Sequence, residues 1–190
     1  MTAAKSLTAA EIEMALSHIA TREHAVRNRC LFITSVLAGF RVSELAALTI
    51  ADVRNADGTV RSEIYLASHR VKHGHARTVY ISTRLQAELA TYIASRTWHT
   101  NSQPFFYTAR GQRCGFSANT MAQHFFWMYR AAGIKNASSH SGRKTFITSL
   151  ASQGVSVFVL ASLSGHKSIS TTQKYVTVND DMKRRAVELV

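Results

Sequence analysis

The amino-acid sequence predicts an α+β domain that is mostly α-helical and contains a small antiparallel β-sheet. The chain has 190 residues, of which 46% are hydrophobic, and this suits one domain with a sizeable core. Apolar residues recur at helical spacing over most of the chain, and alternation occurs only near the middle. Pro104 is the only proline, so long helices meet few interruptions. We therefore expect residues 1–190 to form a single domain without linkers or internal repeats.

Two helices are expected at the start of the chain. Thr8 can cap the first helix while Glu11 reaches back to the backbone, which is the capping-box pattern. Apolar residues at helical spacing then continue to Ala20. The second helix should run over residues 23–38. Gly39 is expected to end it, because glycine readily adopts the left-handed conformation that stops a helix.

The middle of the chain changes from a helical to a strand-like pattern. A short helix capped by Ser43 is expected over residues 44–48. Residues 60–66 then alternate in polarity, and a second extended run follows at 78–81 after a basic stretch. Asp57-Gly58 marks the turn into the first run. These features predict an antiparallel hairpin with a basic tip.

Helical patterns fill most of the second half. A helix is expected over residues 83–94, followed by a short extended piece and a turn at 110–113. The next helix, over 117–133, carries aromatic residues at helical spacing. This spacing favours core packing over a base-stacking surface, with only Trp127 or Tyr129 exposed.

Three further helices are expected near the C-terminal end. The first is capped by Ser138 or Ser139, the second ends at Gly165, and the third begins at Ser168 and carries Tyr175 near its end.

The charge of the chain indicates a polyanionic partner. The formal net charge is +12, and the basic residues are not gathered in low-complexity tracts. Nucleic acid is the first candidate partner, and the alternative is a basic protein whose charge only keeps it soluble. Cys30 and Cys114 lack C-x-x-C spacing, which fits a reducing compartment without a disulfide framework. No signal peptide or membrane span is indicated, so we expect no membrane partner.

Two arginine-containing motifs have the chemistry to hold a phosphate. His140 and Arg143 are three residues apart on an expected helix, so they lie about one turn apart on one side. A guanidinium can grip two oxygens while an imidazole exchanges one proton. Arg41 follows the Gly39 helix stop, and Glu44 can pair with it and fix its orientation. Each motif alone is equally compatible with an ordinary surface pair.

Three further residues complete a possible phosphodiester chemistry. Tyr175 has a hydroxyl that can attack phosphorus. His166 stands at a helix boundary, where its ring can project into a cleft or simply cap the helix. Lys72 lies at the tip of the expected hairpin, where it can act as a general acid or remain solvated.

The combination resembles the tyrosine recombinases, also called the phage-integrase family. RVSEL at 41–45 resembles the first arginine box of that family, and KHGHAR at 72–77 resembles its hairpin lysine motif. HSGR at 140–143 resembles H-x-x-R, and LSGH at 163–166 resembles L-x-G-H. Tyr175 falls where the family nucleophile should lie. The resemblance runs through essentially the whole chain and implies the catalytic-domain fold of the family.

The resemblance implies a site-specific DNA recombinase that cleaves and rejoins strands. Tyr175 would attack a DNA phosphodiester, leaving a 3′-phosphotyrosyl link and a free 5′-hydroxyl. Lys72 would protonate the leaving oxygen, and His140 would help to accept the tyrosine proton. The transition state would be stabilised by Arg41, Arg143 and His166. Glu44 would organise the site, and neither a metal nor a cofactor is expected.

The resemblance also implies the partners. These are double-stranded DNA with a specific recombination site and three further copies of the chain on synapsed DNA, with an accessory DNA-bending protein as a further candidate. The free protein would be a monomer or weak oligomer, cytoplasmic and nucleoid-associated, from a bacterium, phage or mobile element. Residues 176–190 carry apolar residues at helical spacing, like the family tail that docks on a neighbouring protomer; packing on its own domain is the alternative. The candidate DNA contacts are Lys72, Arg77, Arg110, Arg113, Lys144 and Lys167.

Two features depart from the family pattern. The catalytic-domain pattern begins almost at Met1, so we expect the N-terminal core-binding domain of the family to be missing. Gly142 and Lys144 occupy positions where an apolar residue and a histidine or arginine are commoner. We expect both to be tolerated because His140 and Arg143 keep their spacing.

Other interpretations remain open at this point. Type IB topoisomerase-like relaxation uses similar chemistry but needs one protomer. A DNA-binding regulator without catalysis would also explain the charge, although it would have no need of Tyr175. A metal site at His69, His73 and His75 is disfavoured, because no cysteine or carboxylate accompanies them.

Overall fold

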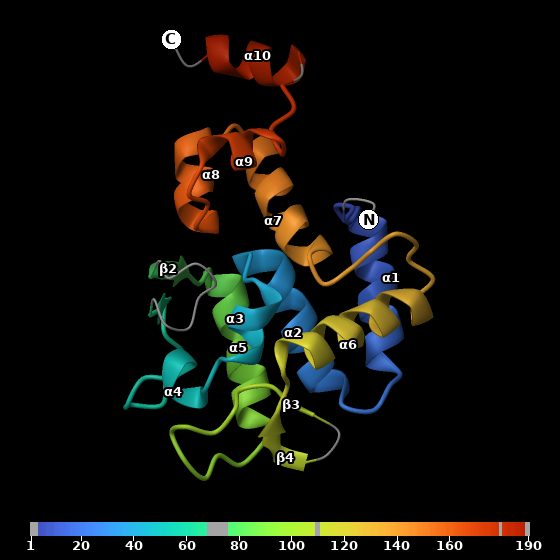
Figure 1. Ribbon diagram of the computed structural model, residues 1–190, viewed down its shortest axis with the longest axis vertical. Helices are drawn as coiled ribbons and strands as arrows, with labels where there is room; N and C mark the ends of the chain where they lie inside the picture. Colours follow the sequence, from blue (N-terminus) through green and yellow to red (C-terminus); the bar gives the residue numbers. More distant parts are fainter. Residues whose placement is uncertain (1–3, 68–75, 109–110, 179, 189–190) are drawn as a thin grey trace.

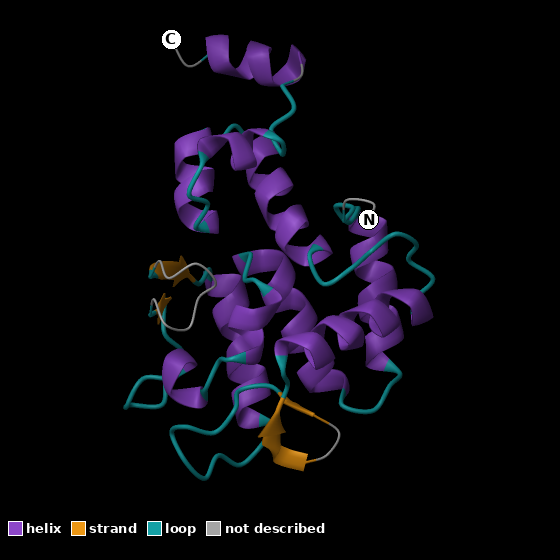
Figure 2. Cartoon of the chain, viewed as in Figure 1, coloured by secondary structure: helices purple, strands orange, loops and turns teal. Residues whose placement is uncertain are grey.

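The computed structural model describes residues 4–67, 76–108, 111–178 and 180–188. It has a helical body with two small β-hairpins, and the C-terminal helix stands away from that body (Figures 1 and 2). The helices are α1 (Ala9–Ala20), α2 (Ala25–Ala38), α3 (Val42–Ala46), α4 (Ile50–Val53), α5 (Thr83–Ala94), α6 (Ala118–Ala131), α7 (Ser141–Ser152), α8 (Val157–Ser164), α9 (Ile169–Gln173) and α10 (Asp180–Val187). The strands are β1 (Glu63–Leu66), β2 (Arg77–Tyr80), β3 (Tyr107–Thr108) and β4 (Gly111–Gly115). The expected mostly helical α+β class is confirmed.

Helix α2 is the centre of the body, because α1, α5 and α7 all pack against it. Most of its side chains are buried, including Leu31, Phe32 and Ile33. Gly39 ends the helix in the left-handed conformation at φ 61°, as the sequence predicted. A Cβ on Gly39 would lie 2.4 Å from the ring of Phe146. The glycine therefore both ends α2 and allows α7 to approach it.

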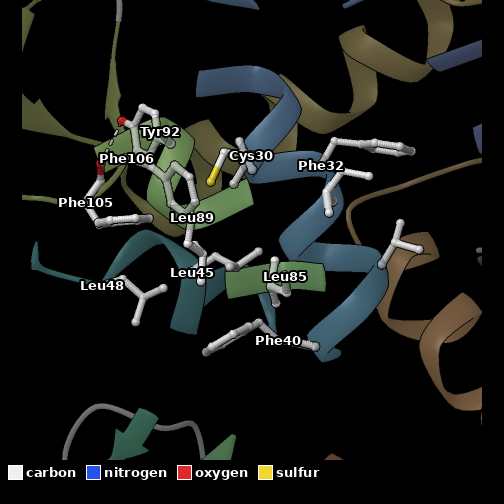
Figure 3. Packing of buried hydrophobic residues seen from close by; sticks show 14 of the residues in the cluster. Cys30, Phe32, Phe40, Leu45, Leu48, Leu85, Leu89, Tyr92, Phe105 and Phe106 are labelled. Atoms are coloured by element: carbon white, nitrogen blue, oxygen red, sulfur yellow. Dashed lines mark hydrogen bonds between the residues drawn. The ribbon is translucent and has the colours of Figure 1, made fainter. Parts of the chain in front are cut away.

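An aromatic cluster fills the core beside the C-terminal half of α5 (Figure 3). The Tyr92 ring stacks on Phe106 and meets Phe105 edge-on, and its hydroxyl donates to the Phe105 carbonyl at 2.8 Å. Cys30 is buried beside this cluster, and burial raises the pKa of its thiol. It is therefore the small buried hydrophobe that its apolar context predicted.

Strands β1 and β2 pair antiparallel, as predicted. Glu63 pairs with Tyr80, and Leu66 pairs with Arg77. Ile64 and Leu66 face the core, and Arg77 and Val79 do so from β2. An arginine thus occupies an inward position on a strand, and this placement decides its role in the site.

Two predicted features of local structure are wrong. The turn expected at 110–113 is largely strand β4, which pairs with β3 through backbone bonds that a short polar sequence does not signal. Ser43 does not cap the short helix, because Glu44 accepts the backbone N–H of Arg41 at 2.7 Å and α3 begins at Val42.

The predicted cap of α7 is also wrong, because His140, rather than Ser138 or Ser139, stands at the start of this helix. Helix α9 ends at Gln173, so Tyr175 lies in the turn that follows it. In α6, Trp127 is 60% exposed, whereas Tyr129 is buried.

The C-terminal helix α10 contacts the body at the end of α7. Arg185 donates to the Ser152 carbonyl at 3.1 Å, and none of the α10 residues that the structure describes is buried. No helix within the described ranges is long and apolar enough to cross a membrane.

Candidate active site

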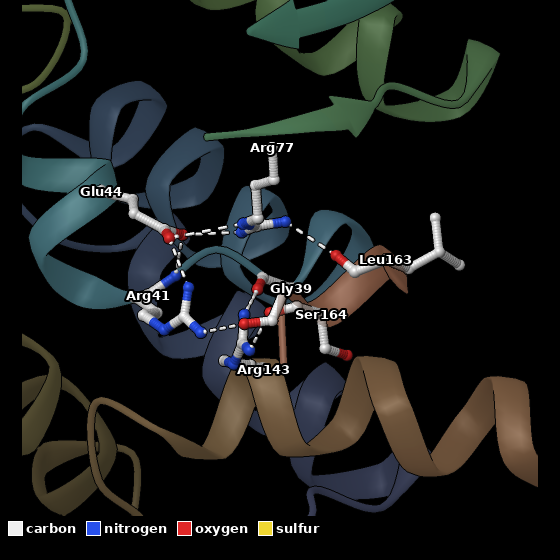
Figure 4. Close-up of polar contacts among 8 residues, drawn as sticks. Gly39, Arg41, Glu44, Arg77, Arg143, Leu163 and Ser164 are labelled. Carbon is white, nitrogen blue, oxygen red and sulfur yellow. Dashed lines mark hydrogen bonds and ion pairs between the residues drawn. The ribbon is translucent and has the colours of Figure 1, made fainter. Parts of the chain in front are cut away.

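Four segments far apart in sequence meet at one place. They are the start of α3, the inward face of β2, the first turn of α7 and the end of α8 (Figure 4). Each contributes a charged side chain or backbone carbonyls to one bonded group.

The Glu44 carboxylate is the anionic centre of this group. Its side chain is fully buried and pairs with Arg41 at 2.8 Å and with Arg77 at 2.7 Å. Burial alone would raise the pKa of the Glu44 carboxyl, but the bonds from Arg77 and Arg41 outweigh burial and hold that pKa below its usual value. Glu44 therefore stays ionised and orients two guanidinium groups.

Arg143 is a buried cation held by backbone carbonyls. Its guanidinium donates to the carbonyls of Gly39 and Ser164. Within the described residues no carboxylate forms an ion pair with it. Burial, followed by the charges of Arg41 and Arg77, lowers its pKa to about 9. Arg143 is thus protonated at neutral pH, and its charge is only partly compensated.

Gly142 is one of the two departures from the family pattern, and helix packing explains why glycine occupies this position. A Cβ at this position would lie 2.2 Å from the Ser35 hydroxyl oxygen on α2. The close approach of α7 to α2 therefore requires glycine here, and the neighbouring Arg143 is held against Gly39 by the same approach.

Three successive carbonyls at the end of α8, those of residues 163–165, each accept a bond from a different arginine. The pairs are Leu163 with Arg77, Ser164 with Arg143, and Gly165 with Arg41. A helix C-terminus carries partial negative charge, so cations placed there are stabilised. We call Arg41, Glu44, Arg77, Arg143 and the backbone of residues 163–165 the arginine frame.

His166 and Tyr175 lie next to the arginine frame. Gly165 adopts φ 61° and ends α8, and His166 follows it. The His166 ring stacks on Tyr175 with 6.1 Å between centroids, and its Nδ1 lies 2.8 Å from the Thr172 hydroxyl. Burial, followed by the charges of the frame arginines, lowers the pKa of His166 to about 4. The imidazole is therefore neutral at pH 7.

The remaining predicted site residues differ in their placement. His140 is exposed at the start of α7, one turn before Arg143. Lys167 is exposed and Lys144 is half-buried. Arg113 lies on β4. Lys72 and Arg110 lie outside the described residues.

Arg77 does not fit its prediction as a DNA contact. Only 8% of the residue is exposed, and its guanidinium is engaged with Glu44 and the Leu163 carbonyl. In the sequence Arg77 follows the basic stretch of the predicted hairpin tip. The signal that could have placed it is its alternation with the inward-facing Val79. Thr172, which contacts His166, was also missed, and we find no sequence signal that would have revealed it.

No group of three or more histidine, cysteine, aspartate or glutamate residues with metal-binding proximity occurs among the residues the structure describes. His69, His73 and His75, which the sequence already disfavoured as a metal site, lie outside that part of the chain.

A sequence model described as the phage integrase family matches residues 5–182. The match covers nearly all of the chain, so the protein belongs to the phage integrase family of tyrosine recombinases, as the resemblance implied.

Individual relatives agree with this membership. The chain is 33% identical over 160 residues to "Tyrosine recombinase XerC" of Pelobacter propionicus, covering 83% of the chain and 50% of the relative. It is 30% identical over 186 residues to "Tyrosine recombinase XerA" of Pyrococcus furiosus, covering 97% and 61%. The chain thus spans about half to three fifths of the length of these relatives. It is also 28% identical to "Type 1 fimbriae regulatory protein FimB" of Escherichia coli, covering 91% of the chain and 84% of that protein.

Solved structures support the fold. A crystal structure of XerA recombinase is similar with a TM-score of 0.75 and 23% identity, covering 100% of the chain and 66% of that structure. The Tn1549 transposon integrase in complex with circular intermediate DNA has a TM-score of 0.74 and 20% identity, with coverages of 99% and 67%. The chain therefore has the tyrosine-recombinase catalytic-domain fold.

Proposed function

We propose that this protein is a site-specific DNA recombinase that cleaves and rejoins strands through a 3′-phosphotyrosyl intermediate on Tyr175. The observation that carries the proposal is the buried, incompletely compensated Arg143 cation, close to a tyrosine stacked on His166. A buried cation that has no carboxylate paired with it attracts an incoming anion. During phosphoryl transfer, negative charge builds up on the phosphoryl oxygens, so the cation stabilises the transition state. Family membership and the names of the relatives support the same reaction class.

In the proposed step the Tyr175 oxygen forms a bond to phosphorus while the bond from phosphorus to the 5′-oxygen breaks. The tyrosine proton passes to His140, and Lys72 supplies a proton to the leaving oxygen. Religation reverses these transfers, so the phosphodiester energy is retained and no nucleotide is consumed. Arg41 and Arg143 stabilise the charge on the non-bridging oxygens.

His166 has a specific task in this scheme. Its ring is neutral at pH 7, since its pKa is lowered to about 4, first by burial and then by the frame arginines. When the Thr172 hydroxyl donates to Nδ1, the single ring proton resides on Nε2. From that nitrogen His166 donates a hydrogen bond to a phosphoryl oxygen. Thr172 would then fix the tautomer that the reaction needs.

The proposed assembly is a tetramer on two synapsed DNA duplexes. Helix α10 supports this proposal, because none of its described residues is buried against the body and Val187 is 72% exposed. The body of a neighbouring protomer would cover this helix. The Tn1549 integrase, which has a similar fold and is described in complex with circular intermediate DNA, supports DNA as the substrate.

The test uses nicked duplexes that trap a covalent intermediate. Sequences are drawn from the DNA flanking the gene, with inverted repeats as first candidates, and the wild-type protein is compared with Tyr175→Phe. We expect a DNA-linked protein band with the wild type and none with the variant, while DNA affinity changes less than about threefold, since only one hydroxyl is lost. Wild-type protein that binds these duplexes and forms no adduct would instead be a DNA-binding regulator.

A second assay distinguishes recombination from relaxation. Supercoiled plasmids with two copies of the cleaved site are incubated with the wild-type protein. Recombinant products support the proposal, whereas relaxation without exchange of flanking DNA would assign the protein to single-protomer, topoisomerase-like chemistry.

A further inference from the structure

Arg77 is a buried arginine in the candidate active site, and the proposed chemistry assigns no role to it. It projects from β2 and is flanked by Glu44 on one side and the end of α8 on the other (Figure 4). Each of its three guanidinium nitrogens donates to the protein. Nη2 and Nε face the two Glu44 oxygens at 2.7 and 3.4 Å, and Nη1 donates to the Leu163 carbonyl at 2.7 Å. The side chain is therefore committed to internal contacts.

The charge of Arg77 differs from that of Arg143 in one respect. Arg77 forms an ion pair with a fully buried carboxylate, whereas Arg143 is held by neutral carbonyls. A cation already matched by Glu44 gains less from an incoming phosphate than one that is not. Of these two buried arginines, Arg143 is suited to bind the substrate. Arg77 is suited to connect protein groups, namely Glu44 and the Leu163 carbonyl.

The contacts of Arg77 join three elements. Glu44 belongs to α3 and also fixes Arg41, so Arg77 acts on Arg41 through a shared carboxylate. Leu163 lies three residues before His166, and the intervening Gly165 packs directly on Arg77. A Cβ on Gly165 would lie 2.6 Å from the Arg77 Cδ. Arg77 is therefore placed to influence two groups. Through Glu44 it affects the orientation of Arg41, and through Leu163 and Gly165 it affects the position of His166 after the end of α8.

We propose that Arg77 is a positioning residue that aligns Arg41 and His166 for strand cleavage without touching DNA. This inference rests on the proposed function. In the sequence Arg77 lies five residues after Lys72, the proposed general acid.

The experiment compares Arg77→Met, which removes the charge and the donors, with Arg77→Lys, which keeps the charge but loses the planar fork. Arg29→Met is the matched control, because Arg29 forms a comparable two-bond pair with Glu88 at the surface. The probe is the nicked duplex that the wild type cleaves. Dissociation constants and single-turnover cleavage rates are measured for each variant.

We expect Arg77→Met to slow cleavage about 100-fold, the size of effect that a displaced catalytic group produces, with DNA affinity within about threefold of wild type. Arg77→Lys should be intermediate, slowed about tenfold, because it restores charge without geometry. Arg29→Met should cleave like the wild type. If Arg77→Met does not fold, Arg77→Lys becomes the test. Slower cleavage with retained DNA affinity supports the positioning role, and equal losses in rate and affinity overturn it.

Histidine NMR of the DNA-free protein provides a readout that needs no cleavage. The His166 pKa should stay at about 4 in Arg77→Lys and rise in Arg77→Met, because Arg77 is one of the cations that lower it. Slow cleavage by Arg77→Lys with an unchanged His166 pKa would identify alignment, rather than charge, as the contribution of Arg77.

The outcomes separate this inference from the function on which it rests. A wild-type protein that forms no adduct contradicts the proposed function. A cleaving wild type with an equally active Arg77→Met overturns the positioning role alone. Equal losses in affinity and cleavage would show that Arg77 contacts DNA, which also overturns it.

Discussion

The arginine frame and the C-terminal end of the chain are held in opposite ways. In the frame, Glu44 and the carbonyls of residues 163–165 bind three guanidinium groups from distant segments. In α10 no described residue is buried, and the ion pairs of Lys183 and Arg184 are local and exposed. The cations are fixed by the fold, whereas the last helix adds little to it.

Tyr175 lies between these two regions. On one side it stacks on His166, which follows the frame directly. On the other side it leads towards α10 through residues 176–178. The cationic environment that we propose for a phosphate is built into the body, whereas Tyr175, the proposed nucleophile, lies on a segment whose continuation has few body contacts. Binding of α10 by a neighbour would therefore affect Tyr175 before it affects the cations of the arginine frame.

The largest expected effect is on cleavage by Arg143→Ala. Removing a cation that serves charge development should slow single-turnover cleavage about 1,000-fold while DNA affinity falls only a few-fold. Arg29→Ala, which removes a surface arginine paired with Glu88, is the control and should leave both quantities unchanged. Equal losses in rate and affinity would assign Arg143 to substrate positioning instead.

The next effect is on folding stability. Glu44→Gln leaves Arg41 and Arg77 without their buried carboxylate, so it should lower the free energy of unfolding by about 3–5 kcal/mol. Glu88→Gln breaks a more exposed pair with Arg29 and should cost less than about 1 kcal/mol. Urea denaturation measures both. Similar losses would mean that the frame is no more important to the fold than the surface pair.

The same carboxylate predicts an acid limit. The pKa of Glu44 is lower in the folded protein than its ordinary value of 4.5, because its bonds to Arg77 and Arg41 outweigh burial. The stability it contributes is therefore fully present above about pH 4.5 and is lost as pH falls through the lower folded pKa. Denaturation as a function of pH should show this loss in the wild type and a weaker dependence in Glu44→Gln.

The smallest effect on stability is expected at α10. Val187→Asp should change the free energy of unfolding by less than about 0.5 kcal/mol, because the side chain is 72% exposed. It should preserve adduct formation on a single site and reduce assembly on two-site DNA, measured by sedimentation. A loss of stability above about 1 kcal/mol, with normal assembly, would mean that α10 packs on its own body.

The sequence was sufficient for features that depend on local chemistry. The Thr8–Glu11 capping box and the glycine stops at Gly39 and Gly165 are all present as predicted. Each follows from one residue type and its immediate neighbours, since caps and left-handed helix ends are decided within a few residues.

The sequence was not sufficient for contacts across the chain. Arg77 meets Glu44 over a separation of 33 residues, and Arg143 meets the Gly39 carbonyl over 104. The first contact depends on the strand register that turns Arg77 inward, and the second on the close packing of α7 against α2. The motif of each residue suggested that it matters, but only the fold distinguishes a residue that faces substrate from one that faces the protein.

The carbonyls of residues 163–165 have a consequence for which mutations the site tolerates. The contribution of Ser164 to the arginine frame is its peptide oxygen, while its hydroxyl is buried and has no hydrogen-bond partner within the described part of the chain. Alanine would preserve the oxygen and remove an unsatisfied polar atom. Gly165 is different, because any Cβ would collide with Arg77. In this segment the groups that hold the arginines belong to the polypeptide backbone. Sequence variation at position 164 among relatives would therefore suggest that Ser164 is dispensable, although its backbone oxygen binds Arg143.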